Sequence, residues 1–223
     1  SFWKAMPEEQ NRIVADHLSE WLFCPSENAR RNLEREGITA GVHMVGDIML
    51  DASLHYRKIV EGDLAQDRTR VPRLFGPGAE GEPLKDFCLL TIHRAENTDD
   101  PARLRSLVTG LAGTARPVVF PVHPRTRKKL AEYGISLPPQ IRPIEPVSYL
   151  EMLELELRSS VIVTDSGGVQ KEAYFLRKPC VTLREQTEWT ETVESGWNRL
   201  AGADAEAIAT AVSTASPPAS HPA

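Results

Sequence analysis

Residues 161–172 read VIVTDSGGVQKE, and this stretch predicts both the fold and the position of a ligand site. The β-branched run from Val161 to Thr164 is typical of a buried parallel strand. Asp165-Ser166-Gly167-Gly168 supplies a turn, and the residues from Val169 to Lys178 are compatible with a helix. The stretch therefore predicts a strand, a tight turn and a helix in direct succession.

The glycines of this turn suit the binding of a phosphate. Gly167 and Gly168 carry no Cβ, so the backbone can turn sharply and a ligand can approach it closely. The first N–H groups of a helix have no partner within it, and the helix dipole adds partial positive charge there. Glu172, one turn into the helix, could reach hydroxyl groups of the molecule that carries the phosphate. The alternatives are that Ser166-Gly167-Gly168 is only a tight connection and that Glu172 is an ordinary surface residue.

Length and composition limit the classes of protein that need to be considered. The chain has 223 residues, 41% of them hydrophobic, which suffices for one large domain or one domain with part of another. Its net charge of -5 and the absence of a basic run argue against nucleic-acid binding. Cys24, Cys88 and Cys180 are widely spaced and odd in number, which indicates reduced thiols, and no His or Cys pair has metal-ligand spacing. Without a membrane-length apolar run or a signal peptide, we expect a cytoplasmic protein without membrane contact.

Strands and helices alternate along residues 86–212, which predicts an α/β fold with a Rossmann-like, doubly wound parallel sheet. The expected strands there cover residues 87–92, 118–120, 141–144, 161–164 and 179–183, and the expected helices cover 100–114, 125–133, 149–157, 169–178 and 203–212. Residues 1–66 contain expected helices over 6–20, 26–36 and 48–62 and strands over 21–24 and 42–45. Residues 67–85 have the Gly and Pro content of a hinge or linker, and residues 213–223 form a Pro/Ser/Ala tail that we expect to be disordered.

Polar groups follow four of the expected strands, at the edge of the sheet where doubly wound folds bind ligands. These groups are His93-Arg94, His123, Ser166-Gly167-Gly168 and Arg184-Glu185. His93 and Arg94 can donate hydrogen bonds to a phosphate, and Arg can donate two in parallel. His123 could do the same, although a His before a Pro is also common as a loop-packing residue. Because no G-x-G-x-x-G motif is present, the residues alone indicate a nucleotide or phosphosugar site and no dinucleotide cofactor.

Five motifs of the chain resemble those of non-hydrolysing UDP-N-acetylglucosamine 2-epimerases. In chain order they are MPEEQNR (6–12), TIHRAEN (91–97), PVHP (121–124), TDSGGVQKEA (164–173) and LREQTEW (183–189). They occur in the order and approximate spacing of the family, and the similarity covers nearly the whole chain except the tail.

The resemblance implies a glycosyltransferase-B-like architecture, with the active site in the cleft between two Rossmann-like domains. Residues 1–66 would be the end of the first domain and the crossover, and residues 86–212 would be the second, UDP-binding domain. The chain would then begin near the end of the first domain, at the helix that carries Glu8. Two further acidic residues that the family uses near the sugar would lie outside it. A homodimer is expected on the same ground.

The implied reaction inverts C2 of the sugar of UDP-N-acetylglucosamine, without a metal, NAD or any other cofactor, for cell-surface polysaccharide precursors. A base removes the C2 proton while UDP leaves C1, and UDP then adds back to the glycal as the proton arrives on the other face. By resemblance, Glu8 is the acid/base carboxylate, and His93 assists the departure of UDP or binds the diphosphate. The residues expected to bind UDP are Arg94, His123, Met152, Ser166, Gly167, Gly168, Glu172 and Arg184. Among these, Ser166 and Gly167 would hold phosphate, Glu172 would bind the ribose, and Met152 would lie near the uracil.

Several alternatives stay open at this stage. Without the resemblance, Glu8 is a solvated residue of a first helical turn and Trp189 is a packing residue. Lys171-Glu172-Ala173-Tyr174 and Trp197-Asn198 look more like archaeal and O-antigen relatives, including enzymes that act on UDP-2,3-diacetamido-2,3-dideoxy-glucuronate. The chain could also be a UDP-binding fragment without turnover, or a glycosyltransferase of the same architecture.

Overall fold

The computed structural model describes residues 7–69, 71 and 86–219, without the side chains of Pro7 and Glu8. The chain forms two compact units, Ser1–Ala52 and Ser53–Ala223. Each unit has its own small set of elements and its own core.

The first unit contains a small two-stranded sheet. Its elements are α1 (Pro7–Leu18), β1 (Leu22–Cys24), α2 (Glu27–Arg35), β2 (Val42–Met44) and the start of α3 (Ile48–Ala65). The two strands pair in parallel, and Leu22, Cys24 and Leu33 form the buried core. Ser26 caps α2, since its hydroxyl accepts a hydrogen bond from the Ala29 N–H at 3.3 Å.

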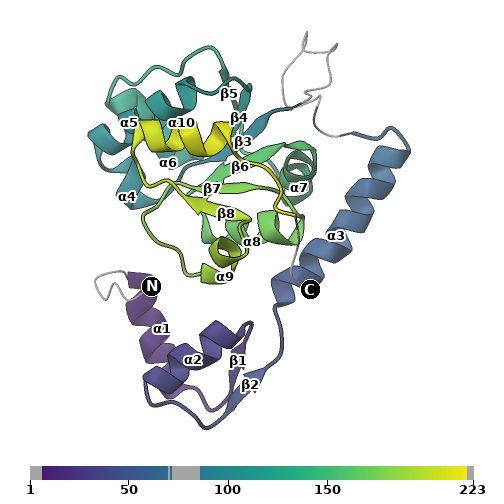
Figure 1. Cartoon of the computed structure of the whole chain (residues 1–223), viewed down its shortest axis with the longest axis vertical. Coiled ribbons are helices and arrows are strands. Elements are labelled where there is room, and N and C mark those ends of the chain that lie inside the picture. The colour runs from purple at the N-terminus through teal and green to yellow at the C-terminus, as the bar shows by residue number, and fades with distance from the viewer. Residues whose placement is uncertain (1–6, 70, 72–85, 220–223) are drawn as a thin grey trace. The chain divides into compact units, whose positions relative to one another are not determined.

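The second unit contains the rest of α3 and a six-stranded sheet. Its elements are β3 (Cys88–Thr91), α4 (Ala95–Thr98), α5 (Pro101–Ala112), β4 (Val118–Pro121), α6 (Pro124–Glu132), β5 (Ile141–Ile144), α7 (Tyr149–Arg158), β6 (Val161–Thr164), α8 (Gly167–Phe175), β7 (Cys180–Thr182), α9 (Thr190–Glu194), β8 (Asn198–Leu200) and α10 (Ala205–Ser213). The strand order is β5-β4-β3-β6-β7-β8, and all neighbours pair in parallel (Figure 1). This confirms the predicted doubly wound parallel sheet.

Helices cover both faces of this sheet (Figure 1). Successive residues of a strand point to opposite faces. Leu90 and Val163 accordingly lie in a core cluster with residues of α5, α6 and α10. Leu89 and Ile162 lie in a second cluster with residues of α7 and α8. Because both faces are covered, the central strands β3 and β6 are apolar except for a Thr at the end of each, and all four residues of β6 are buried.

Some of the predicted boundaries need correction. A helical turn, α4, follows the expected strand over residues 87–92, since the Arg94 carbonyl accepts hydrogen bonds from the Asn97 and Thr98 N–H groups. Helix α8 begins at Gly167 because both glycines of the turn join its first turn. Helix α3 continues past Gly62 to Ala65. Helix α9 and strand β8 were not expected, because five and three residues are too short to show a hydrophobic period.

The expected linker and tail lie partly outside the described residues. The boundary between the two units falls within α3, between Ala52 and Ser53. Of the linker expected over residues 67–85, the structure describes 67–69 and 71. Residues 214–219 have no regular secondary structure, although Ala215 packs against the core and the Thr214 hydroxyl accepts a hydrogen bond from Arg199 at 2.7 Å. The hinge and the disordered tail therefore stay predictions.

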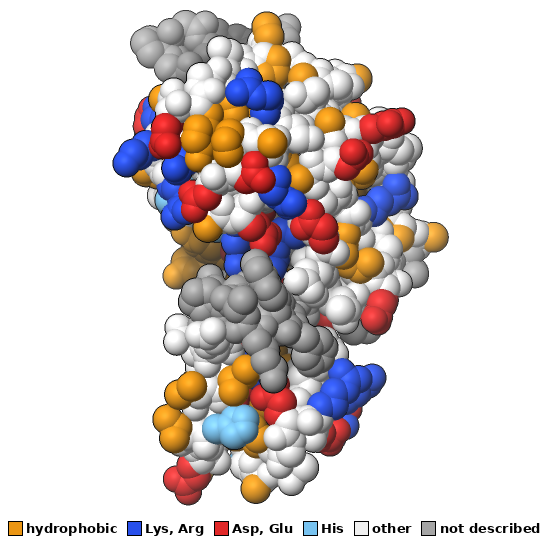
Figure 2. Space-filling model, turned by 90° about the vertical axis from the view of Figure 1, so that its left-hand side faces the viewer, with side chains coloured by type: hydrophobic (Ala, Val, Ile, Leu, Met, Phe, Trp, Pro, Cys, Tyr) orange, Lys and Arg blue, Asp and Glu red, His pale blue; other side chains and the backbone are white. Residues whose placement is uncertain are grey.

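Acidic and basic side chains are interspersed on the face of the molecule shown in Figure 2. Exposed ion pairs of the second unit include Arg125–Asp99 and Arg127–Glu145. Such pairs contribute little to stability, so the two core clusters hold the second unit together. None of the described helices has the length and apolarity needed to cross a membrane.

Gly110 lies where α5 packs against α10, and Gly110→Ala is expected to destabilise the second unit by about 1–3 kcal/mol. A Cβ at this position would lie 2.8 Å from the Ala205 carbonyl oxygen and 3.0 Å from the Ile208 Cβ, so the two helices would have to separate. Gly62→Ala in α3 is the matched control, because nothing lies within 4 Å of its added Cβ. Alanine there should stabilise by about 0.5–1 kcal/mol. Urea unfolding measures both changes, and an unaltered midpoint for Gly110→Ala would contradict the close α5–α10 contact.

Candidate functional site

The candidate site lies at the point where the sheet changes its winding direction. From β3 the chain moves outward through β4 to β5, and it then returns to β6 on the opposite side of β3. The connections that follow β3 and β6 therefore leave in opposite directions, and such switch points are where open α/β sheets bind ligands. His93 follows β3 and Ser166 follows β6, so the two principal motifs of the sequence meet here.

Asp165 joins these two connections. Its side chain is fully buried at the end of β6. The carboxylate accepts hydrogen bonds from the backbone N–H of His93 (3.1 Å to each oxygen) and from that of Arg94 (3.0 Å). The Asn97 side-chain amide donates to the same carboxylate at 3.1 Å. Because every partner is a donor, Asp165 fixes the backbone of the His93-Arg94 loop against the end of β6.

The imidazole of His93 also faces Asp165, with Nδ1 3.4 Å from Oδ1. Burial lowers the pKa of His93, an effect that His123 and Arg94 reinforce and the Asp165 carboxylate opposes. The neutral ring is therefore favoured at neutral pH. A hydrogen on Nδ1 suits the neighbouring carboxylate, which leaves Nε2 for a ligand.

His123 caps a helix and also lies beside His93, and its contact with a phosphate stays a prediction. Its Nδ1 accepts a hydrogen bond from the Arg125 N–H at 3.2 Å, so the residue caps the N-terminus of α6. Its ring centroid also lies 5.9 Å from that of His93. Because Nδ1 is an acceptor, the hydrogen of the neutral ring is on Nε2. The structure thus places a second imidazole donor next to His93.

The N-terminus of α8 forms the opposite side of the switch point. Ser166 is the N-cap and accepts a hydrogen bond from the Val169 N–H at 3.5 Å. A Cβ added to Gly167 would lie 3.3 Å from Trp189 Nε1, 3.8 Å from Glu188 Oε2 and 3.9 Å from Arg94 Nη2. Three side chains from two loops therefore approach the first turn of α8 at Gly167. The Arg94 guanidinium adds a full positive charge to the partial charge of this helix end.

Trp189 packs over the same helix end. Its ring lies 4.1 Å from the Lys171 ammonium, a cation–π contact. Its buried Nε1 makes no hydrogen bond to any residue that the structure describes. The packing role considered for Trp189 thus fits, and the residue also shapes the surface around Gly167.

Glu172 is buried in α8 beside a second acidic residue, Glu156 of α7. Burial raises the pKa of Glu172, while contacts with Tyr149 and Glu156 lower it in part. Burial also raises the pKa of Glu156, and the charge of Glu172 adds to the shift. Glu172 is therefore part of an acidic pair and is not the ordinary surface residue of the alternative interpretation.

Arg184 is buried and already paired. Its guanidinium donates to Glu188 through two bonds of 3.0 Å and to Glu96 at 3.2 Å. Burial opposes ionisation of Glu188, but the bonds from Arg184 outweigh it and lower the pKa of that carboxyl. Arg184 thus fixes Glu188 next to Gly167. Direct contact between Arg184 and UDP stays a prediction.

The other predicted site residues lie apart from this group or outside the description. Met152 is half-buried in α7 and packs against the second core cluster. Glu8 lies in α1 of the first unit, and its side chain is outside the described residues. The predicted roles of these two residues, uracil contact and acid/base catalysis, stay predictions. In the described part of the chain, no group of three or more His, Cys, Asp and Glu side chains could hold a metal ion.

Three residues that hold the others in place were not predicted from the sequence, namely Asp165, Asn97 and Glu188. Glu156, the buried acidic neighbour of Glu172, was not predicted either. Asp165 and Asn97 lie within the two main motifs, so their spacing from Ser166 and His93 was visible, but their side chains appeared to serve a turn and a loop. Glu188 lies within the Leu183–Trp189 motif. Glu156 gives no signal in the sequence, because it reads as one of several charged residues of an amphipathic helix.

The fold and the switch-point site define the chain as containing a Rossmann-like α/β domain with a candidate ligand site. The model of the family described as UDP-N-acetylglucosamine 2-epimerase matches residues 1–222. The chain belongs to the UDP-N-acetylglucosamine 2-epimerase family.

Individual relatives agree with this assignment. A UDP-N-acetylglucosamine 2-epimerase homolog of Methanococcus maripaludis is 44% identical over 97% of this chain and 59% of its own length. The UDP-2,3-diacetamido-2,3-dideoxy-D-glucuronate 2-epimerase of Pseudomonas aeruginosa is 45% identical over 93% of this chain and 56% of its own. The Methanocaldococcus jannaschii UDP-GlcNAc 2-epimerase, solved in complex with UDP-GlcNAc and UDP, matches with a TM-score of 0.84 at 40% identity over 98% of this chain and 62% of that one. The chain thus spans less than two thirds of each of these relatives.

Proposed function

We propose that this chain is the UDP-binding part of a non-hydrolysing UDP-N-acetylglucosamine 2-epimerase, which interconverts UDP-N-acetylglucosamine and UDP-N-acetylmannosamine. The observation that supports this most is the meeting of His93, Arg94 and the N-terminus of α8 around one buried carboxylate, Asp165. This arrangement offers hydrogen-bond donors and positive charge at one place, which suits a diphosphate. The M. jannaschii relative, solved with UDP-GlcNAc and UDP, supports the same ligand class.

In the proposed reaction, the bond between C1 and the UDP oxygen breaks and its electron pair leaves with UDP. The C2–H bond breaks as well, its proton goes to a base, and its electron pair forms the C1=C2 double bond of a glycal. UDP then adds to C1 again while C2 receives a proton on the opposite face. Negative charge grows on the diphosphate during departure, so Arg94 and the N–H groups of Gly167 and Gly168 would stabilise the transition state.

Two glutamates have distinct proposed roles. Glu172 would accept hydrogen bonds from the ribose hydroxyls, since it lies one turn from the N-terminus of α8. Glu8 would serve as the acid/base carboxylate, a role that rests on the family resemblance of its motif. Positioned acid/base groups typically accelerate a reaction by ~10²–10⁴-fold, so turnover depends on the carboxylates of the first domain.

UDP binding is the direct test of this proposal, and calorimetry of the whole chain with UDP measures it. Gly167→Ala is expected to weaken UDP binding about tenfold or more, because the added methyl group narrows the approach to the first turn of α8 and displaces Trp189 or Arg94. Gly62→Ala should bind UDP as the parent chain does. Absence of UDP binding at millimolar concentration, or equal affinity in both variants, would refute the site.

UDP binding is also expected to take up a proton. Burial lowers the pKa of His93 in the free protein, whereas a bound diphosphate would raise it, since an opposite charge nearby favours the imidazolium. UDP affinity should therefore fall as the pH rises from about 6 to 8. Calorimetry in buffers of different ionisation enthalpy measures the uptake, and His93→Gln serves as the control that corrects for the titration of UDP itself. Equal uptake by both proteins would rule out His93 as the group that is protonated.

A second candidate substrate is UDP-2,3-diacetamido-2,3-dideoxy-glucuronate, which is supported by the 45% identity to the P. aeruginosa relative. Proton NMR in D₂O with each UDP-sugar distinguishes the candidates, because deuterium enters C2 only of a sugar that is turned over. Broadening of the uridine signals without exchange would indicate a UDP-binding fragment. We also propose a homodimer, which sedimentation equilibrium would test.

A further inference from the structure

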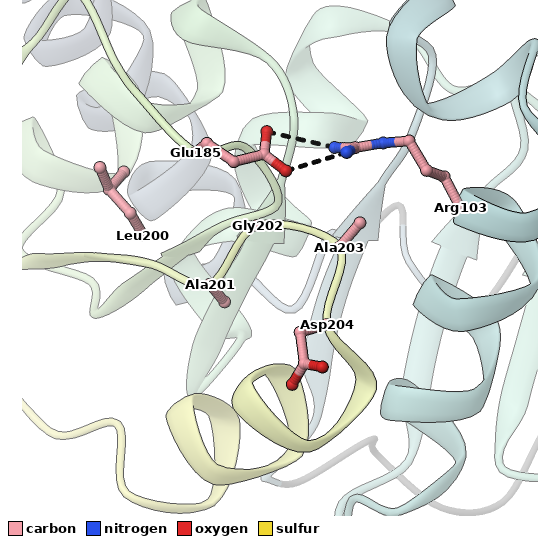
Figure 3. Close-up of a pocket in the computed structure, with 7 residues that line it drawn as sticks. All are labelled: Arg103, Glu185, Leu200, Ala201, Gly202, Ala203 and Asp204. Atoms are coloured by element: carbon pink, nitrogen blue, oxygen red, sulfur yellow. Dashed lines mark hydrogen bonds and ion pairs between the residues drawn. The ribbon is translucent and has the colours of Figure 1, made fainter.

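A hydrogen-bonded series of side chains leads from the surface of the second unit to His93. It begins at an open pocket of about 510 Å³, lined by Arg103, Glu185 and residues 200–204 (Figure 3). In this pocket the Arg103 guanidinium donates to both oxygens of Glu185, at 2.9 and 3.2 Å. Glu185 follows β7, the strand that pairs with β6, and Leu200 ends β8.

The Arg103 guanidinium also binds Asn97, which lies buried behind the pocket. Arg103 Nε and Nη2 donate to Asn97 Oδ1 at 3.3 and 3.2 Å. Asn97 is fully buried, and its Nδ2 donates to Asp165 at 3.1 Å and to the Leu183 carbonyl at 3.0 Å. Every hydrogen-bonding group of this amide is therefore used. If the amide turned over, its oxygen would face the Asp165 carboxylate and its NH₂ would face the guanidinium, so Arg103 fixes its orientation.

The orientation of Asn97 turns its NH₂ group, and not its oxygen, toward the Asp165 carboxylate. With Asn97 and two backbone N–H groups as donors, Asp165 acts only as an acceptor. The His93 nitrogen that faces this acceptor is Nδ1, at 3.4 Å. A hydrogen on Nδ1 is then favoured, and Nε2 keeps the lone pair that can take up a proton and then donate a hydrogen bond to a diphosphate.

We propose that Arg103 is a positioning residue for His93, which acts through Asn97 and Asp165 and selects the imidazole tautomer that leaves Nε2 available. Glu185 restrains Arg103 from the pocket side. The proposal depends on the proposed function only for the identity of the ligand, because the series of hydrogen bonds exists without one.

The test is ¹⁵N NMR of the histidine rings in the whole chain at pH 8, with the His93 signals assigned from a His93→Gln sample. The parent chain should show hydrogen on Nδ1 of His93. Arg103→Met should give a mixture of both tautomers and bind UDP about tenfold more weakly, a loss typical of residues that orient a functional histidine through its partner. Arg105→Met is the matched control on the same helix, because Arg105 bonds the Tyr133 carbonyl and none of the series.

Two milder variants cover the case in which Arg103→Met fails to fold. Arg103→Lys keeps the charge but loses the fork that reaches both Asn97 and Glu185. Glu185→Gln changes a side chain that is 63% exposed, so it should leave the fold intact and shift the tautomers in the same direction by less. Parent-like ring signals in the Arg103 variants would overturn the positioning role. If the Arg103 variants show a tautomer mixture but the parent chain does not bind UDP, the positioning role is supported and the proposed function is refuted.

Discussion

Asp165→Ala is expected to cost about 3–5 kcal/mol of folding free energy, the range for removing one partner of a buried charged network. The substitution leaves the His93 N–H, the Arg94 N–H and the Asn97 amide without their acceptor in a buried site. Each stranded donor carries a desolvation cost, and together they would release the loop after β3. Urea unfolding at neutral pH measures the loss.

A variant of the same shape separates the charge of Asp165 from its size. Asp165→Asn keeps one acceptor oxygen but turns an NH₂ group toward the other donors, and we expect it to cost about 1–3 kcal/mol. Because the Asp165 carboxylate raises the pKa of His93 against the effect of burial, this pKa should fall further in Asp165→Asn. Histidine NMR titration measures it.

Asp204→Ala is the control for both Asp165 variants. Asp204 caps α10 through one hydrogen bond, to the Ala207 N–H at 2.8 Å, so its loss should cost about 1 kcal/mol and leave His93 unchanged. An Asp165→Ala protein no less stable than Asp204→Ala would show that Asp165 does not organise the site.

The sheet could be predicted from the sequence because each of its central strands is short, mostly apolar and followed by a turn. The run over residues 161–164 is an example, since burial on both faces removes any need for polar residues. Strand β8 could not be predicted, because its three residues, Asn198-Arg199-Leu200, form a strand only through pairing with β7. Pairing of that kind is a tertiary effect, and local sequence carries little trace of it.

The site could be predicted from the sequence only for those residues that directly follow a strand. His93 and the Ser166-Gly167-Gly168 turn were placed correctly at one edge of the sheet, because the carboxyl ends of parallel strands share an edge. The strand order decides which of these ends are adjacent, and a sequence does not contain it in readable form. The roles of Asp165 and Asn97 depend on that adjacency, since both reach across from one connection to another.

Glu156→Gln is expected to stabilise the protein at neutral pH, by about 1.4 kcal/mol for each unit by which the pKa of Glu156 in the folded chain exceeds that in the unfolded chain, because an amide has no ionisation to lose on folding. Glu156 is 1% exposed, and its carboxyl oxygens make no hydrogen bond of normal geometry within the described residues. Burial, together with the nearby Glu172 charge, raises its pKa. Below the pKa of the unfolded chain, the carboxyl is neutral in both states and costs no ionisation energy. As the pH rises above that value, only the unfolded state ionises readily, so the parent chain loses stability until the folded pKa is passed.

The gain in unfolding free energy from Glu156→Gln should therefore be small at pH 4 and large at pH 7. Urea unfolding at both pH values measures it. Glu154 supplies a matched control two residues earlier in α7. It is equally buried, but it accepts hydrogen bonds from Arg158 at 3.2 Å and from the Val71 N–H at 3.4 Å. Because its charge is paired, Glu154→Gln should destabilise at neutral pH, with the opposite sign to Glu156→Gln. If both variants destabilised equally, Glu156 would have to be ionised and paired in the folded protein, and the acidic pair with Glu172 would not be the source of its raised pKa.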